Sequence, residues 1–289
     1  MIAPSLAHGQ PPRFALVLGG GAARGAAHVG VLRAFVEEGL RPELLVGVSM
    51  GAIIGAVFAT EDDPGRALGR LQHAATALQA GFLDLPPIIK SLRVLGLFGR
   101  HQRRRWLEGH LGLRGLRFES LRLPLRVTAT RLFPPGRAVF GASPDELVVE
   151  ALMASSALPS RFPVRYHGKL LVDGALAGNL PTLTALEMGA RVIVAVNLGF
   201  LFRRRVDLGR FLPWRVIDRV AKAQMRREVE LCRRRGAAVI EIGPDCFETE
   251  SILAFEKLDK LIEAGYNATQ LSLPAIRGAL QKERIVTAS

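Results

Sequence analysis

The sequence predicts an α/β fold in which a mostly parallel central sheet is covered by helices on both faces. Short, nearly continuous apolar runs of strand length recur along the chain, for example at residues 14–18 (FALVL) and 192–198 (VIVAVNL). Such runs are typical of strands that are buried on both faces. Segments with apolar residues at helical spacing separate them, as crossovers between parallel strands require. We expect residues 1–289 to form one domain, with a helical insertion over residues 64–122.

The first part of the chain contains two strand-to-helix units. Residues 14–18 lead into a glycine-rich turn at 19–25, and apolar residues at helical spacing follow over residues 26–38 as far as Gly39. Residues 44–48 (LLVGV) form the next expected strand, and small residues at helical spacing follow it from Gly51. Residues 66–122 then carry helical patterns interrupted by glycines and prolines, which indicates the inserted helical region.

The remainder of the chain continues the alternation of strands and helices. Residues 126–133 and 137–140 are expected to pair around a Pro-Pro-Gly turn. A helix is expected over about residues 144–153, and a hairpin over residues 164–172 turns at His167-Gly168. The later expected elements are a short helix ending near residue 188, a strand at 192–198, a basic helical segment at 203–235, a strand at 237–242 and helices to about residue 282.

The composition favours anionic partners. Lys and Arg number 39 against 26 Asp and Glu, so the formal net charge is +13, which suits nucleic acid, phospholipid head groups or acidic metabolites. Cys232 and Cys246 lack the spacing of a metal or redox motif, so we expect no metal or cofactor and a reducing, cytoplasmic location. Residues 1–12 lack a signal-peptide pattern, and no run reaches the roughly 18 apolar residues of a membrane span. We therefore expect a soluble protein, or one bound peripherally to the inner membrane surface.

Ser49 is the candidate nucleophile. It lies in the motif Gly47-Val48-Ser49-Met50-Gly51, between an apolar run of strand length and a helical pattern. A serine on such a sharp strand-to-helix turn projects its hydroxyl out of the sheet, and the flanking glycines leave room where side chains would collide. The N-terminus of the following helix would face any anion that forms beside this hydroxyl.

The glycine-rich turn at residues 19–25 is a candidate anion site, because exposed amides at a strand-to-helix turn can bind a negative charge. A dinucleotide site is the alternative, but the sequence does not fit G-x-G-x-x-G. Counting from Gly19 places Arg24 last, and counting from Gly20 places Ala22 in the middle. The second strand ends in the Ser49 turn, so it supplies no acidic residue for a ribose. Arg24 could steady the turn, contact a phosphate or lie on the surface.

Activation of a serine hydroxyl at neutral pH needs a base. An α/β-hydrolase places its catalytic histidine after the acid, but the last histidine of this chain is His167, which precedes Asp173. An aspartate is the remaining option, and Asp173-Gly174 at the end of an expected strand is the best placed. An ordinary Asp-Gly turn is the alternative interpretation. We expect His28 to pack in the first helix without a catalytic role.

Three motifs resemble those of the patatin-like phospholipases: residues 19–25 with His28 and Gly30, the Gly47–Gly51 motif, and Asp173-Gly174-Ala175. Residues 154–159 and 255–266 also resemble segments of that family, so the resemblance covers most of the chain. It implies a catalytic dyad without histidine and an oxyanion hole formed by the amides of the glycine-rich loop. The implied site residues are Ser49 (nucleophile) and Asp173 (base), Gly20, Gly21, Ala22, Arg24 and Gly25 of the loop, Gly47 and Gly51 of the nucleophile turn, and Gly174 and Ala175.

One position departs from the family pattern. Ala22 stands where the family usually has a third consecutive glycine, two places before the basic residue. Alanine still supplies an amide, but it resists a positive φ and adds a methyl group near the expected oxyanion. We expect a slightly reshaped oxyanion hole that remains active.

The resemblance implies a serine lipid acyl hydrolase of the phospholipase A or lysophospholipase type. The alternatives are a general carboxylesterase or thioesterase, and a non-catalytic, basic module that binds membrane or nucleic acid. A nucleic-acid partner is disfavoured, because it would require aromatic residues among the arginines at positions where they could stack on bases. Only Trp106 and Trp214 lie near the arginines in the sequence. An anionic membrane surface is the expected partner. Residues 203–235 combine apolar and arginine residues as an interfacial helix does, although packing on the sheet would explain the same pattern.

Overall fold

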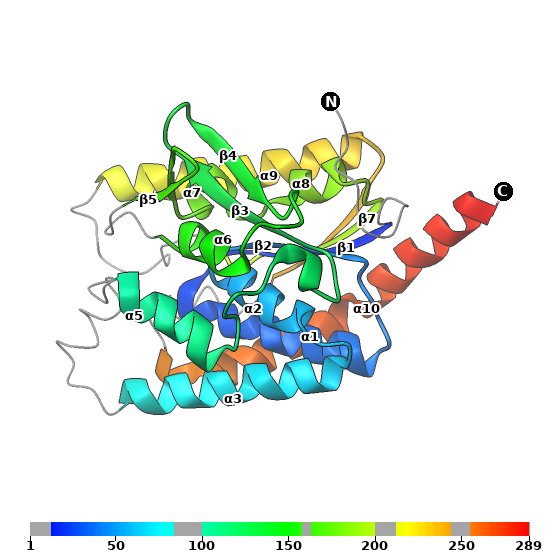
Figure 1. Ribbon diagram of the computed structural model, residues 1–289. Helices are drawn as coiled ribbons and strands as arrows, with labels where there is room; N and C mark the ends of the chain where they lie inside the picture. Colours follow the sequence, from blue (N-terminus) through cyan, green and yellow to red (C-terminus); the bar gives the residue numbers. More distant parts are fainter. Residues whose placement is uncertain (1–12, 84–99, 158–162, 200–211, 244–254, 289) are drawn as a thin grey trace.

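The computed structural model describes residues 13–83, 100–157, 163–199, 212–243 and 255–288. Their strands form one eight-stranded sheet in the order β5-β6-β3-β2-β1-β7-β8, with β4 paired to β3 (Figure 1). The strands are β1 (Phe14–Leu18), β2 (Leu44–Val48), β3 (Leu125–Arg131), β4 (Gly136–Phe140), β5 (Val164–Tyr166), β6 (Lys169–Val172), β7 (Val192–Val196) and β8 (Ala238–Ile242).

The centre of the sheet is parallel and buried on both faces. The five strands β3, β2, β1, β7 and β8 run parallel to their neighbours, whereas β4, β5 and β6 pair antiparallel at one side of the sheet. Every residue of β1, β2 and β7 is buried. The expected mostly parallel sheet is therefore confirmed.

Two groups of helices cover the two faces (Figure 1). One face carries η1 (Ala22–Ala26), α1 (Ala27–Glu37), α2 (Met50–Ala59), α3 (Pro64–Leu83) and α10 (Leu258–Ala288). The other face carries α7 (Ala175–Gly178), α8 (Thr182–Glu187) and α9 (Leu212–Arg234). Successive side chains of β1 point to opposite faces of the sheet. Leu16 and Leu18 therefore pack in the larger hydrophobic cluster, and Ala15 and Val17 pack in the smaller one on the other face.

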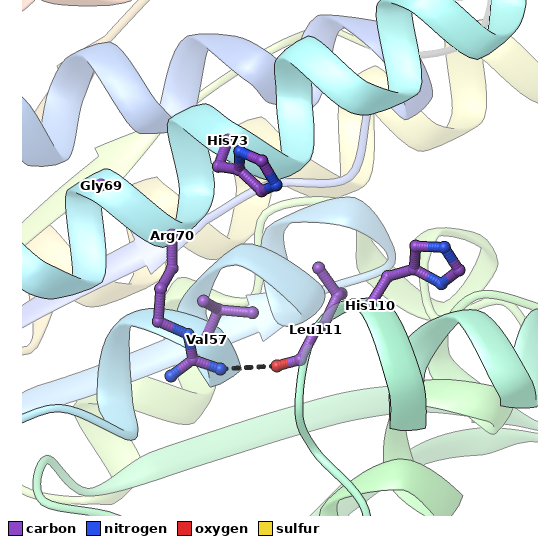
Figure 2. A pocket seen from close by; sticks show the side chains of 6 residues that line it. All are labelled: Val57, Gly69, Arg70, His73, His110 and Leu111. Carbon is purple, nitrogen blue, oxygen red and sulfur yellow. Dashed lines mark hydrogen bonds between the residues drawn. The ribbon is translucent and has the colours of Figure 1, made fainter.

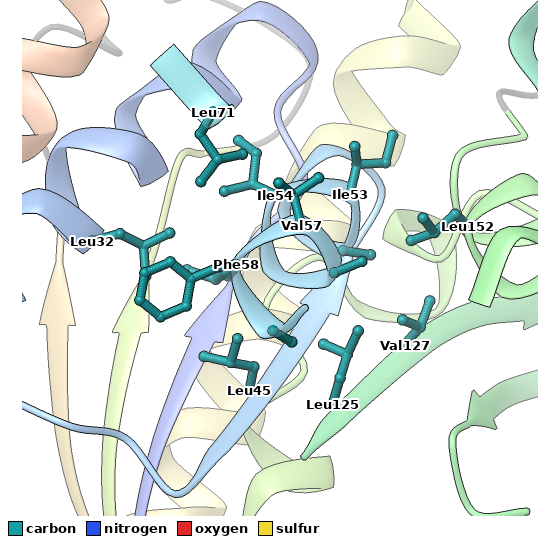
Figure 3. Close-up of a cluster of buried hydrophobic side chains, with 14 of the residues drawn as sticks. Leu32, Leu45, Ile53, Ile54, Val57, Phe58, Leu71, Leu125, Val127 and Leu152 are labelled. Carbon is teal, nitrogen blue, oxygen red and sulfur yellow. The ribbon is translucent and has the colours of Figure 1, made fainter. Parts of the chain in front are cut away.

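The described residues between α2 and β3 are mainly helical, and residues 84–99 of the expected insertion lie outside the described part of the chain. The described residues contain α3, α5 (Arg100–Arg105), η2 (Trp106–His110) and η3 (Phe118–Ser120). Leu71 of α3 and Val57 of α2 belong to the same cluster of buried side chains as Leu125 of β3 (Figure 3). The inserted helices therefore complete the core on this face of the sheet.

Two expected boundaries differ from the structure. The helix expected from residue 144 is α6 (Val148–Ser155), which begins later because the preceding residues form a turn. In that turn Ser143 Oγ donates to Asp145 Oδ1, and the Glu146 carboxylate accepts from the Gly141 amide. The expected basic helix at 203–235 corresponds to α9 from Leu212, and residues 200–211 lie outside the described part of the chain. Among the described helices, none combines the length and apolar character that a membrane crossing demands.

Candidate active site

Ser49 lies on a strained turn between β2 and α2. Its backbone has φ 52° and ψ −122°, a region that residues with a side chain rarely occupy. A Cβ on Gly47 would lie 2.5 Å from Ala52 Cα, and one on Gly51 would lie 2.2 Å from the Leu18 carbonyl oxygen. The turn therefore closes only with glycine on both sides of Ser49, as the motif predicted.

The Ser49 side chain is bonded to Asp173, which follows the end of β6. Ser49 Oγ donates to Asp173 Oδ2 at 2.9 Å, and the Ala175 amide donates to Asp173 Oδ1, also at 2.9 Å. Gly174 is held against β3, since a Cβ there would lie 2.2 Å from the Thr128 carbonyl oxygen. The structure thus brings together the hydroxyl of the Ser49 motif and the carboxylate and amide of the Asp173-Gly174-Ala175 motif.

Burial of the Asp173 carboxylate raises its pKa above the ordinary aspartate value. Only 2% of the residue is exposed, and desolvation raises its pKa to about 6. Hydrogen bonds from the Ala175 amide and Ser49, and the charge of Arg103, act in the opposite direction. A carboxylate with this pKa is largely ionised at pH 7 and still accepts a proton more readily than an exposed aspartate does.

The C-terminal end of α6 holds both members of this pair in register. Ser155 Oγ accepts a hydrogen bond from the Ser49 amide at 2.8 Å and donates one to the Thr128 carbonyl at 2.7 Å. The carbonyl of Ala157, just beyond the helix, accepts from the Asp173 amide at 2.7 Å. One short stretch of backbone therefore contacts the nucleophile turn, the sheet and the carboxylate turn.

Arg103 connects the inserted helices to this end of α6. Its guanidinium donates to the Ser156 carbonyl at 2.5 Å and to the Met153 carbonyl at 3.0 Å. Arg103 is only partly exposed, and its charge lowers the pKa of Asp173. This contact could not be predicted from sequence motifs, because it joins residues about fifty positions apart.

The glycine-rich loop follows β1 and lies against Ser49. A Cβ on Gly20 would lie 2.6 Å from Asn179 Oδ1 and 3.2 Å from Ser49 Cβ, so a side chain here would press on both residues. Within the described residues, no group accepts a hydrogen bond from the amides of Gly20 or Gly21. Ala22 has φ +48°, so the family's glycine position is here an alanine held in the left-handed region.

The other two loop residues are interior. Arg24 is 2% exposed, so the surface interpretation is wrong; its Nη1 donates to the Leu198 carbonyl at 3.2 Å. This bond ties the loop to the chain beyond β7. A Cβ on Gly25 would lie 2.2 Å from Met50 Cγ, so Gly25 allows the loop to pack directly on the residue after Ser49.

Two residues that contact the loop were not identified as site residues from the sequence. Asn179 Nδ2 donates to the Gly20 carbonyl at 3.1 Å, and His28 Nε2 lies 2.7 Å from the Gly19 carbonyl oxygen. His28 was correctly expected to be buried in the first helix, but its bond to the loop was not foreseen. Asn179 stands two residues before Pro181 and reads as an ordinary turn residue, so the sequence carried no signal for it.

A narrow apolar cavity of about 50 Å³ is lined by Ala22 of the glycine-rich loop and by Met50, the residue after Ser49. Ile53, Ile54 and Val57 of α2 also line it. Val57 lies seven positions after Met50 along α2, which corresponds to a rise of about 10 Å along the helix axis. The other lining residues are Ala23, Ala26, Val29, Leu71, Ala74, Ala75, Leu78, Trp106, Leu111, Phe255 and Leu258.

A second cavity, of about 240 Å³, shares the lining residues Val57 and Leu111 with the first (Figure 2). Its polar lining residues are Arg70, His73 and His110. The Arg70 guanidinium is bonded within the protein: it donates to the Leu111 carbonyl at 2.6 Å and forms an ion pair with Glu61 at 2.6 Å. Unlike the smaller cavity, this larger one is lined neither by a residue of the glycine-rich loop nor by Met50, so it lies apart from the Ser49 turn. No cluster of three or more potential metal ligands occurs in the part of the chain with described coordinates.

The chain is similar to curated patatin-like phospholipases. Patatin-like phospholipase domain-containing protein 6 of Homo sapiens is 28% identical over 281 residues, covering 88% of this chain and 20% of that protein. Lysophospholipase NTE1 of Mycosarcoma maydis is 26% identical over 279 residues, covering 88% of this chain and 14% of that protein. This chain thus spans at most about a fifth of the length of either relative.

The fold also matches a solved structure. Human GIVD cytosolic phospholipase A2, in complex with methyl gamma-linolenyl fluorophosphonate, aligns with a TM-score of 0.55 and 14% identity. The alignment covers 97% of this chain and 61% of that one. The family model described as patatin-like phospholipase matches residues 16–186, a span that contains Ser49, Asp173 and the glycine-rich loop. The chain therefore belongs to the patatin-like phospholipase family.

Proposed function

We propose that this chain is a serine lipid acyl hydrolase of the phospholipase A or lysophospholipase type. The observation that carries the proposal is the 2.9 Å hydrogen bond from Ser49 Oγ to a buried carboxylate oxygen of Asp173. A serine on a strained turn, bonded directly to a base, is the arrangement that nucleophilic catalysis needs. The names of the relatives, among them a lysophospholipase, support a lipid ester as the substrate.

In the proposed reaction, Asp173 Oδ2 takes the Ser49 proton while Ser49 Oγ bonds to the ester carbonyl carbon. The carbonyl oxygen becomes negative and accepts hydrogen bonds from the Gly20 and Gly21 amides. Collapse of this intermediate breaks the ester C–O bond, and Asp173 returns the proton to the departing alcohol. Water then gives a proton to Asp173 and attacks the carbonyl carbon of the acyl-enzyme. The bond to Ser49 Oγ breaks, Asp173 returns the proton to Ser49, and the fatty acid is released.

The apolar cavity beside Met50 supports an acyl chain as the group next to the scissile bond. Its lining residues are apolar throughout, so it offers a fatty chain burial without hydrogen-bonding partners. Each buried methylene contributes about 0.8 kcal/mol to binding. The net charge of +13 supports an anionic lipid surface as the place where the substrate is met.

The test compares two serine–aspartate pairs of the same chain. Ser49→Ala and Asp173→Asn should each abolish hydrolysis of phosphatidylcholine and lysophosphatidylcholine. The exposed pair Ser143 and Asp145, joined at 2.7 Å, provides the matched controls Ser143→Ala and Asp145→Asn, which should keep wild-type rates. A fluorophosphonate should label wild type and both controls but not Ser49→Ala.

Other outcomes separate the alternatives. Turnover of short-chain esters or thioesters without turnover of lipids would identify a general carboxylesterase or thioesterase. Vesicle binding with neither turnover nor labelling would identify a non-catalytic binding module. Lipid turnover that survives Ser49→Ala would exclude the proposed nucleophile.

A further inference from the structure

We infer that His28 and Asn179 are positioning residues that orient the two oxyanion donors, each by fixing one peptide plane of the glycine-rich loop. The inference rests on the proposed function, since it assigns the Gly20 and Gly21 amides to the oxyanion. Both side chains contact loop carbonyls, and neither touches the nucleophile in the described contacts.

The contact of His28 fixes the first peptide plane. His28 is fully buried on α1, and its Nε2 lies 2.7 Å from the Gly19 carbonyl oxygen. A carbonyl can only accept, so Nε2 carries the proton. Burial lowers the pKa of His28 to about 4, so the ring is neutral and this tautomer persists at working pH. Its Nδ1 has no partner among the described residues, which leaves the bond to the loop as the ring's polar contact.

The contact of Asn179 fixes the second plane. Asn179 is 3% exposed, and its Nδ2 donates to the Gly20 carbonyl at 3.1 Å and to the Gly199 carbonyl at 2.8 Å. One amide group therefore spans the glycine-rich loop and the turn after β7. Asn179 follows α7, which begins directly after Asp173-Gly174, so the base and this loop contact lie on one short segment.

These two bonds determine where the donors point. A trans peptide is planar, and its N–H is directed opposite to its C=O. A Gly19 carbonyl directed at His28 therefore turns the Gly20 N–H away from α1, and a Gly20 carbonyl directed at Asn179 turns the Gly21 N–H away from α7. Both amides lack an acceptor within the described residues, although Gly20 is buried against Ser49. A buried amide without a partner, such as that of Gly20, is rare, and an oxyanion would supply the missing acceptor.

The test uses variants that change one contact at a time. Asn179→Asp replaces the donor by an oxygen of the same shape, and His28→Leu removes the ring's donor. Both should lower kcat about tenfold to a hundredfold with KM changed less than about threefold, because a misdirected donor is felt in the transition state. His28→Gln carries an amide nitrogen at the position of Nε2 and should recover most of the rate.

A second readout separates positioning from general structural damage. A trifluoromethyl ketone with a fatty chain forms an oxyanion on Ser49, so its affinity should fall in proportion to kcat/KM across the variants. Asn267→Asp is the matched control, since Asn267 is an exposed residue of α10, and this variant should keep the wild-type rate and ketone affinity. The melting temperature of each variant shows whether it is folded.

Wild-type kcat in folded Asn179→Asp and His28→Leu would overturn the inference while leaving Ser49 and Asp173 in place. So would an equal loss in His28→Gln and His28→Leu, or ketone affinity that stays constant as kcat falls. If one of the two variants His28→Leu and Asn179→Asp does not fold, the other one still tests the inference by the same measurements. A wild-type chain that neither turns over lipid nor reacts with a fluorophosphonate would instead remove the proposed function, and the inference with it.

Discussion

Ser49 donates its hydrogen bond to a carboxylate, that of Asp173, whose surface is 98% buried and whose second oxygen is held by the Ala175 amide. The base is thus oriented by a backbone group, where a histidine would need a further side chain. The desolvation that makes Asp173 a stronger base also opposes its ionisation in the folded protein. Activity and the contribution of Asp173 to stability should therefore respond to pH in opposite directions.

The first prediction concerns the pH profile of activity. Because the Asp173 pKa is raised to about 6, kcat/KM should rise tenfold per pH unit below about pH 6 and level off above it. Initial rates on a neutral, soluble ester over this range would measure the profile. A plateau that extends unchanged down to about pH 4, near the ordinary aspartate pKa, would show that a different base acts.

The second prediction concerns stability. The Asp173 pKa is about 6 in the folded state and 3.8 ordinarily, so the folded protein binds this proton more tightly. The resulting stabilisation is complete below pH 3.8 and is lost as the pH rises through 6. Asp173→Asn should therefore be more stable than wild type near pH 8, by up to about 3 kcal/mol, and this advantage should shrink as the pH approaches 4.

His28 contributes with the opposite sign. Its pKa is lowered from 6.5 to about 4, so its contribution to stability is present above pH 6.5 and is lost as the pH falls toward 4. The two effects partly cancel in wild type. Melting temperatures of Asp173→Asn and His28→Gln across this range would resolve them, and parallel curves for wild type and Asp173→Asn would contradict the assigned shift.

The third prediction concerns Arg103. Arg103→Met removes a positive charge that lowers the Asp173 pKa, so the acid limb of the activity profile should move to higher pH. Arg103→Lys keeps the charge but cannot reproduce both contacts to the Ser156 and Met153 carbonyls. We expect the lysine variant to keep the limb in place with a lower kcat. If the acid limb of both variants lies at the same pH as that of the wild type, Arg103 has only a structural role.

Much of this site could be predicted from the sequence, because its motifs are local. The Ser49 turn and the Asp173-Gly174 turn are each defined by residues next to one another, where glycine meets a steric demand that sequence spacing reveals. The contacts of Ser155, Arg103 and Asn179 join distant segments and follow from tertiary packing. The start of α6 was misplaced for a local reason, since Ser143 and Asp145 bond to each other in a turn.

The fourth prediction concerns Ala22. Its φ of +48° costs an alanine about 1 kcal/mol, so Ala22→Gly should raise the melting temperature by about 2 °C and change kcat modestly. Ala22→Val adds a β-branched side chain at the same backbone angle and should lower kcat about a hundredfold. Calorimetry and initial rates measure both effects. Full activity in Ala22→Val would place the oxyanion away from this loop.

The last prediction concerns acyl-chain length. Ala75 of α3 lines the apolar cavity that begins beside Met50, whereas Ala77 on the same helix is exposed. A phenylalanine at residue 75 would fill space that an acyl chain needs, and exclusion of two to four methylenes corresponds to about tenfold to a few hundredfold in kcat/KM. Ala75→Phe should therefore lower kcat/KM for a dodecanoyl ester by this factor and leave a butanoyl ester nearly unchanged. Ala77→Phe should affect neither ester. Equal losses on both esters in Ala75→Phe, with Ala77→Phe unaffected, would show that the acyl chain binds elsewhere.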